Sequence, residues 1–178
     1  MMSTHYGVDL KEPLLTQVNV MDNFFPSEVF SQVNEWFTRE LHWFYNPYVN
    51  IEGDHPDDFQ FQHVFLLPDR GFVSGYTNFL EPFFERIPAS GWIRIKANLR
   101  TKSDEVRVGG FHIDFEDCVT SIFYFNDNNG QTTFESGGYV KSVANRLITF
   151  PSNLRHSGST CTDAKARFVL NLNYMPPT

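Results

Sequence analysis

From Gly91 onward the chain is a series of short segments in which apolar and polar residues alternate, separated by Gly, Asn, Asp, Ser and Pro. Alternation with a period of two predicts β-strands that bury one face. The expected strands are Trp92–Thr101, Gly110–Phe115, Val119–Asn126, Thr132–Glu135, Tyr139–Val143, Arg146–Phe150 and Arg167–Tyr174. Many short strands at close spacing favour an antiparallel sandwich or barrel. We therefore expect residues 91–178 to form a β core.

Residues 1–90 are predicted to support that core. Leu14–Val20 has the character of a strand, and two amphipathic helices are expected over Ser27–Leu41, with Ser27 as N-cap, and over Ser74–Arg86. The Pro- and Asp-rich stretch Asp54–Asp58 is predicted to be a solvated loop. Because 178 residues suit one domain, the change at Gly91 is a change of element type within a single domain, mainly β with flanking α-helices.

Composition excludes several classes of protein. The formal net charge is −7, which argues against nucleic acid as a partner, since phosphate binding needs a basic surface. No apolar run approaches the length of a membrane span, and Met1–Asp9 lacks the pattern of a secretory signal. Cys118 and Cys161 fit no paired metal spacing and are expected to be free thiols. A cytoplasmic location is expected.

Three residues have the chemistry of a metal site. In a strand, His112 and Asp114 would point to the same face, so that both could approach one ion. His156 follows another predicted strand, and two histidines with one carboxylate are the ligand set of non-haem iron, which leaves coordination positions open. Taken singly, the first two residues could be a surface ion pair and His156 a structural residue.

The last predicted strand, Arg167–Tyr174, carries a cation and two amides, Asn171 and Asn173, on one face. A buried cation needs a partner, and a carboxylate ligand would suit the planar guanidinium. A salt bridge to an Asp or Glu of the protein is the alternative. Tyr124 could donate to the same carboxylate, or could be a core aromatic with a polar tip.

At this point the sequence resembles the 2-oxoglutarate/Fe(II)-dependent dioxygenase superfamily, and within it the prolyl-hydroxylase-like branch. The matching stretches lie in the family's order, with a weaker N-terminal match in VNVMDNFFPSEVF (residues 18–30). They are FHID (111–114), CVTSIFYFN (118–126), NGQTTFESG (129–137), NRLITFPSNLRHSG (145–158) and ARFVLNLNY (166–174).

The resemblance implies a double-stranded β-helix, the cupin-like jelly-roll. It implies that His112, Asp114 and His156 bind Fe(II) and form the catalytic centre. Arg167, with Tyr124 and Asn171, would bind 2-oxoglutarate as cosubstrate. Relatives often have a cosubstrate-contacting Tyr on the strand before His-x-Asp, where this chain offers Asn98 or Arg100.

The implied reaction is hydroxylation by O2 of a peptidyl proline or another small amino-acid-like group, with release of succinate and CO2 and with ascorbate as candidate reductant. A cupin-like or inactive protein that only binds a metal or ligand is the alternative, although cupins favour three His and a Glu. Nucleic-acid demethylases of the superfamily carry a second Arg six residues after the first, where this chain has Asn173.

Overall fold

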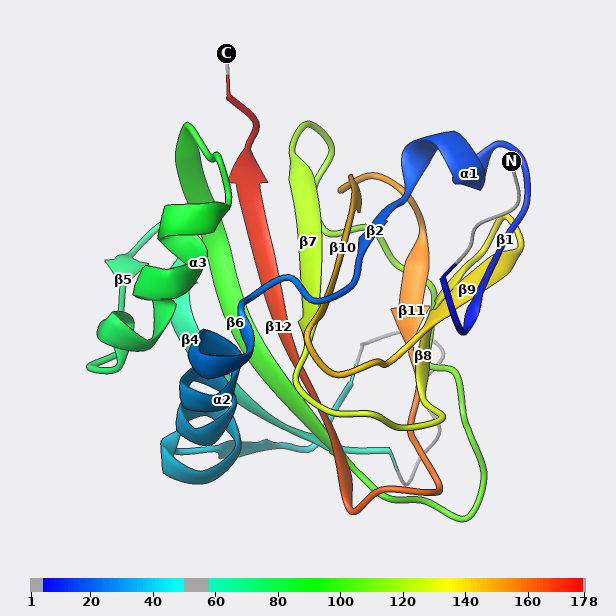
Figure 1. Ribbon diagram of the computed structural model, residues 1–178, viewed down its shortest axis with the longest axis horizontal. Helices are drawn as coiled ribbons and strands as arrows, with labels where there is room; N and C mark the ends of the chain where they lie inside the picture. Colours follow the sequence, from blue (N-terminus) through cyan, green and yellow to red (C-terminus); the bar gives the residue numbers. More distant parts are fainter. Residues whose placement is uncertain (1–4, 50–57, 178) are drawn as a thin grey trace.

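Two facing β-sheets form the body of the computed structural model, which describes residues 5–49 and 58–177 (Figure 1). The larger sheet has, in spatial order, β2 (Asn19–Met21), β10 (Arg146–Pro151), β7 (Val119–Tyr124), β12 (Ala166–Met175), β6 (Gly91–Thr101), β4 (Gln60–Leu67) and β3 (Phe44–Asn46), with β5 (Gly71–Phe72) paired to β4. The smaller sheet has β1 (Val8–Leu10), β9 (Gly138–Lys141), β8 (Gln131–Phe134) and β11 (His156–Gly158). All pairings between these strands are antiparallel, which confirms the predicted jelly-roll class.

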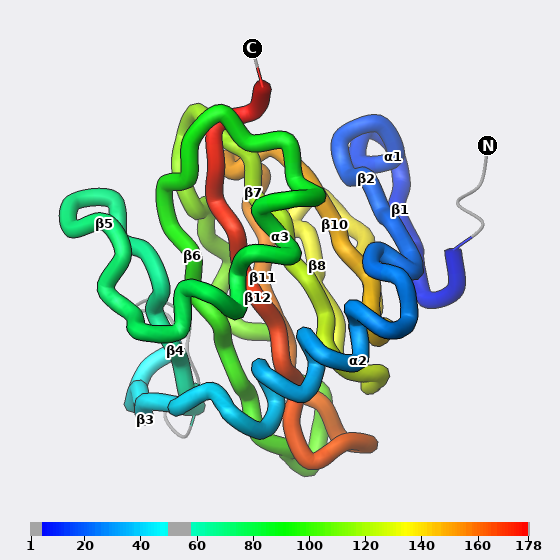
Figure 2. The backbone as a smooth tube through the Cα atoms, turned by 60° about the vertical axis from the view of Figure 1, so that its left-hand side comes forward, coloured from blue at the N-terminus to red at the C-terminus, as the bar shows by residue number. Residues whose placement is uncertain are grey.

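The helices α2 (Ser27–Glu35) and α3 (Glu81–Arg86) cover the outer face of the larger sheet. Helix α2 continues as a π-helical turn (Trp36–Glu40), and α3 follows a 3-10 turn (Thr77–Leu80). Figure 2 shows α2 and α3 crossing in front of that sheet. The short α1 (Leu14–Gln17) lies instead near β1 and β2 (Figure 1). The inner face of the larger sheet is thus left to face the smaller sheet.

Strand β6 shows how the sequence produces this two-sided sheet. Ile95 and Ala97 point to the helices and are fully buried in the aromatic core. The alternate residues of the same strand point the other way and line a pocket between the sheets: they are Arg94, Lys96, Asn98 and Arg100. Since successive side chains of a strand point to opposite faces, one strand builds both the core and the pocket wall.

The outer core is dominated by phenylalanine. Phe123 on β7 is fully buried, with ring centroids of Phe25, Phe83 and Phe125 lying 5.5, 5.2 and 5.0 Å away. Such edge-to-face contacts add to the free energy gained from burying the rings. This cluster joins the helices to the sheet that carries the pocket residues.

We expect Phe123→Ala to lower the free energy of unfolding by about 3–5 kcal/mol, because it leaves a cavity among rings that cannot collapse fully. Urea denaturation monitored by circular dichroism measures this loss. Phe44→Ala is the matched control, since Phe44 is 61% exposed and its loss should cost no more than about 0.5 kcal/mol. Equal costs for the two substitutions would contradict this account of the core.

Several predicted elements differ in the structure. The predicted strand Leu14–Val20 is wrong: α1 occupies its first part, and only Asn19–Met21 pairs, with β10. Leu14 and Val18 lie four apart and are both buried, which is a helical spacing that the prediction missed. Of the helices, α2 has Pro26 rather than Ser27 at its N-cap.

The predicted strand Gly110–Phe115 is also wrong. With the described residues this segment makes an isolated bridge, His112 with His156, and a backbone bond from Asp114 N to Ser152 O, and it is not a strand. Strand β4, where the stretch FQFQHVF (59–65) alternates like a strand, lies beside β6 in the larger sheet. The β core therefore begins before Gly91.

Both cysteines are free thiols, as predicted. Within residues 5–49 and 58–177, no helix has the length and apolar character needed to cross a bilayer.

Candidate metal centre and pocket

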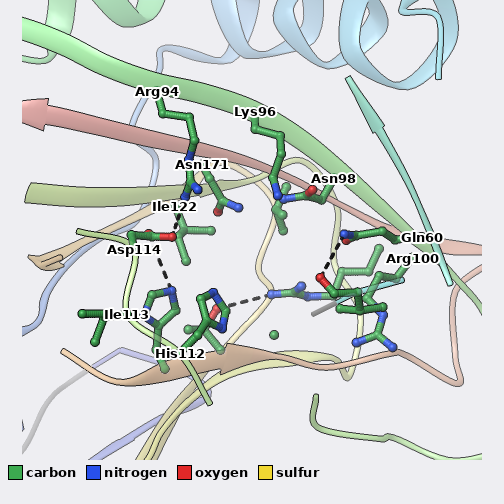
Figure 3. Close-up of a pocket in the computed structure, with 16 residues that line it drawn as sticks. Gln60, Arg94, Lys96, Asn98, Arg100, His112, Ile113, Asp114, Ile122 and Asn171 are labelled. Carbon is green, nitrogen blue, oxygen red and sulfur yellow. Dashed lines mark hydrogen bonds and ion pairs between the residues drawn. The ribbon is translucent and has the colours of Figure 1, made fainter. Parts of the chain in front are cut away.

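The candidate site lies in the pocket between the two sheets (Figure 3). Its larger wall is the inner face of β6, β7 and β12, and its opposite wall includes Thr132 of β8 and two residues of β11. The segment that carries His112 and Asp114 completes the pocket. Strands distant in sequence therefore contribute to one cavity.

The three predicted metal ligands meet in this pocket. One ligand atom from each of His112, Asp114 and His156 can be chosen so that all lie within 4.8 Å of one another. The Nε2 atom of His156 is 3.8 Å from Oδ2 of Asp114, and the two imidazole centroids are 4.8 Å apart. The bridge between His112 and His156 aligns their backbones, although the His-x-Asp segment is not a strand. The arrangement is that of a facial triad of two histidines and one carboxylate.

The Asp114 side chain is 5% exposed and is held by three donors. Arg94 Nη2 donates to its Oδ1 at 2.5 Å, while Thr120 Oγ1 and Asn173 Nδ2 donate to its Oδ2 at 2.8 and 3.0 Å. Burial by itself would raise the pKa of Asp114, but Arg94, His156 and the two hydrogen bonds outweigh it and hold the pKa at about 2. The carboxylate is therefore ionised and fixed in orientation.

Each histidine is oriented through its other ring nitrogen. His156 Nδ1 lies 2.9 Å from the carbonyl of Leu154, and His112 Nδ1 lies 3.2 Å from the carbonyl of Gly110. A carbonyl accepts only from N–H, so these contacts place the proton on Nδ1 and direct the Nε2 lone pair of His156 towards Asp114. Burial lowers the pKa of His156, which keeps its imidazole neutral and able to bind a metal.

We expect acid to destabilise the metal-free protein partly through Asp114. Its pKa is about 2 in the folded protein and 3.8 in the unfolded reference, so its contribution is complete above pH ~4 and is lost as the pH falls towards 2. The loss should be about 2 kcal/mol. Urea denaturation between about pH 5 and pH 2 should show that the free energy of unfolding falls more steeply for the native sequence than for Asp114→Asn. Parallel declines of the free energy in the two proteins would contradict this role of Asp114.

Arg167 lies at the other end of the pocket and is 4% exposed. Its Nε donates to Ser142 Oγ at 2.7 Å, its Nη2 lies 3.4 Å from Thr132 Oγ1, and the Tyr124 ring centroid is 5.4 Å from its Cζ. Within the described residues it pairs with no Asp or Glu, unlike the other buried arginines Arg100 and Arg146. The predicted alternative, an internal salt bridge, is therefore not seen in that part of the chain.

Two glycines pack closely against the Arg167 side chain. A Cβ at Gly130 would lie 2.7 Å from Arg167 Cδ, and a Cβ at Gly158 would lie 3.3 Å from its Nη1. Any side chain at either glycine would crowd the arginine. The two glycines therefore allow Arg167 to take its buried position at this end of the pocket.

The remaining predicted residues fall into two groups. Asn98, Asn171 and Arg100 line the pocket, and the Oδ1 atoms of both asparagines are buried without a hydrogen-bond partner. Tyr124 is not among the lining residues: it is fully buried behind Arg167 and its hydroxyl donates to Thr132 Oγ1 at 2.8 Å. Burial raises the pKa of this phenol, so Tyr124 is a neutral donor already engaged with the protein.

Sequence reasoning missed two charged pocket residues, Arg94 and Lys96, and misplaced Asp58, which lies outside this pocket. Arg94 and Lys96 alternate with the core residues of β6, and this alternation was a signal for them. Asp58 had been assigned to a solvated loop, but it is buried and accepts from Arg100 Nη2 at 2.6 Å and Arg107 Nη2 at 3.1 Å. The rest of that predicted loop, residues 54–57, lies outside the described residues.

Comparison with solved structures places this architecture among known folds. A 2OG-Fe(II) oxygenase family oxidoreductase from Burkholderia pseudomallei aligns with a TM-score of 0.64 at 12% identity, covering 90% of this chain and 86% of that one. A prolyl hydroxylase from Trichoplax adhaerens, in complex with a peptide of hypoxia inducible factor, aligns with a TM-score of 0.58 at 15% identity. The alignment covers 89% of this chain and 83% of that one. HygX from Streptomyces hygroscopicus, with nickel and 2-oxoglutarate bound, aligns with a TM-score of 0.58 at 11% identity. The alignment covers 94% of this chain and 88% of that one.

No family model and no curated protein sequence matches the chain. At 11–15% identity the structural likeness shows the fold, which is the jelly-roll of the 2-oxoglutarate-Fe(II) oxygenases. A shared fold does not by itself define an activity, so the function has to be argued from the site.

Proposed function

We propose that the protein is an Fe(II)- and 2-oxoglutarate-dependent oxygenase. One observation carries the proposal: the triad of His112, Asp114 and His156 faces the same pocket as Arg167, a buried cation that pairs with no carboxylate of the described chain. A metal triad alone would suit many activities. Arg167 indicates that an acidic ligand binds in the same cavity, because a buried charge without a partner is energetically costly.

The residues present fit the metal. Two imidazoles and one ionised carboxylate are the donors of the facial triad, which suits Fe(II) and leaves positions open for a ligand. The carbonyls of Leu154 and Gly110 fix the rings, which is the usual role of such outer partners. When bound, Fe(II) and 2-oxoglutarate supply the activation of O2, with succinate and CO2 as products.

The chain's own residues have distinct roles in this proposal. Arg94 fixes the orientation of the Asp114 carboxylate and offsets its charge. Arg167 would bind the distal carboxylate of 2-oxoglutarate, since it lines the same pocket as the triad and pairs with no carboxylate of the described residues. Ile122 and Val169, on neighbouring strands of the same face, give the pocket an apolar wall that limits water.

Hydroxylation of an amino-acid-like group is the reaction we propose. Peptidyl proline is one candidate substrate class, supported by the likeness to the Trichoplax adhaerens prolyl hydroxylase. A free amino acid or similar small metabolite is the other. Both would reach the metal through the pocket that Asn98 and Asn171 line.

The test is an anaerobic titration of the protein with Fe(II) and then 2-oxoglutarate, watching for the visible metal-to-ligand charge-transfer band. We expect a saturable band in the native protein, weakened in His112→Ala and in Arg167→Met. Succinate release in air then reports turnover. Absence of Fe(II) binding, or an unchanged band in both variants, would overturn the proposal and favour a protein that only binds a ligand.

A further inference from the structure

Lys96 is the one pocket cation, among the described residues, for which no ion pair or hydrogen bond is found. It projects from β6 into the cavity beside Arg94 (Figure 3). Its cross-strand neighbour is Asn171 on β12, and Asn98 follows two residues along the same face. Burial, and then repulsion from Arg94, lowers the pKa of Lys96 to about 8, so the amine is still mainly an ammonium at neutral pH.

Charge in the pocket is unbalanced. Four basic side chains line it, and Asp114 is the one carboxylate among its described lining residues; the basic residues are Arg94, Lys96, Arg100 and Arg167. Arg94 pairs with Asp114, and Arg100 pairs with Asp58 behind the wall. In the proposed function Arg167 is matched by 2-oxoglutarate. Lys96 then remains without a negatively charged partner among the described residues, although the protein as a whole has a net charge of −7.

The groups around Lys96 are also unsatisfied. Asn98 is 9% exposed and no hydrogen bond of its side chain is found, and its Oδ1 is fully buried. The Oδ1 of Asn171, on the neighbouring strand, is also buried and has no hydrogen-bond partner among the described residues. Buried amide oxygens without partners are rare in folded proteins and point to a ligand that would supply hydrogen-bond donors. An ammonium beside two free acceptors therefore suits a ligand that carries both a carboxylate and a donor such as an amino group.

We infer that Lys96 binds the carboxylate of the substrate and that the Oδ1 atoms of Asn98 and Asn171 accept from its amino group, so that the substrate is a small free amino acid rather than an internal residue of a peptide. This inference rests on the proposed function and narrows it. An internal peptidyl proline has no carboxylate to pair with Lys96, whereas a free amino acid has one. Lys96 is thus assigned as a specificity-determining residue.

The test uses full-length protein loaded anaerobically with Fe(II) and 2-oxoglutarate. The probes are the proteinogenic L-amino acids, each matched with its carboxamide, and a proline-containing peptide with both ends blocked. Binding is read from the change that a probe causes in the charge-transfer band, and coupling from stimulated succinate release. The variants are Lys96→Met, which keeps length and removes charge, and Lys165→Met as control, because Lys165 is an exposed lysine outside the pocket.

We expect at least one amino acid to bind ~10-fold or more tightly than its amide, a preference that Lys96→Met should remove and Lys165→Met should keep. The affinity for 2-oxoglutarate should stay within about twofold of native in Lys96→Met. A native protein without the band would overturn the proposed function itself. With the band present, three results would each overturn only the present inference: no acid preference, a blocked peptide that binds best, or loss of 2-oxoglutarate affinity in Lys96→Met, which would assign Lys96 to the cosubstrate.

Discussion

Asp114→Asn is expected to weaken Fe(II) binding by at least ~100-fold, because it removes the only anionic ligand of the candidate centre. The asparagine side chain would also place its NH2 group against a hydrogen-bond donor. Arg94 donates to Oδ1 of Asp114, and Thr120 and Asn173 donate to Oδ2, so either orientation of the amide loses at least one of these bonds. Equilibrium titration with Fe(II) under anaerobic conditions measures the loss. Circular dichroism establishes that the variant is folded.

Asp117→Asn is the matched control for this substitution. Asp117 is exposed and lies three residues further along the same segment, so it shares the local sequence but not the site. It should bind Fe(II) as the native protein does. His112→Ala is a second variant that removes a less buried ligand. Native-like affinity in a folded Asp114→Asn protein would mean that the metal, if bound, lies elsewhere.

Arg167→Met is expected to raise the dissociation constant for 2-oxoglutarate by ~100-fold, since it removes a charge-assisted, bidentate contact worth about 2–3 kcal/mol. Fe(II) affinity should change little, because Arg167 makes no contact with the three ligands. The two effects are separable by titrating the metal first and the keto acid second. Folding should survive, because the substitution removes a buried cation that has no carboxylate partner in the described chain.

Arg155→Met serves as control for the loss of an arginine near the site. Arg155 is next to His156, yet its side chain is 52% exposed and pairs with Glu135. Its replacement should leave 2-oxoglutarate binding unchanged, since exposed ion pairs contribute little. Arg167→Lys adds a finer test: it keeps the charge but loses the planar fork, so an intermediate affinity is expected. A 2-oxoglutarate affinity unchanged in Arg167→Met would remove this residue from the site.

The strands that could be predicted are those whose pattern is local. In β6 and β12 the face towards the helices carries an apolar residue at every second position, whereas β7 and β10 have apolar residues on both faces. The predicted bounds of all four strands are close to the observed ones. Shorter strands such as β1 and β11 carry too few residues for a period to show. Their pairing is decided by partners far along the chain, which is not a local property.

For the site, the sequence by itself determined the residue types and their order. A His-x-Asp pair, a later His and an Arg eleven residues beyond it were enough to predict the triad and the cation, and the structure brings all four residues to one pocket. Chemistry limited the choice, because few ligand sets combine two imidazoles with one carboxylate. The pairing of His112 with Asp114 was argued from a strand that the structure does not contain, yet both side chains line the same pocket.

Only the tertiary structure decided which charges are paired. Arg94 pairs with Asp114 and Arg100 with the buried Asp58, while Lys96 has no such partner among the described residues. Sequence separation does not predict these pairings, because charge pairing depends on distances across strands and on burial, which also determine pKa values. The sequence therefore specified the candidate metal ligands, and the fold revealed a cation without a partner among the described residues, from which the acidic substrate is inferred.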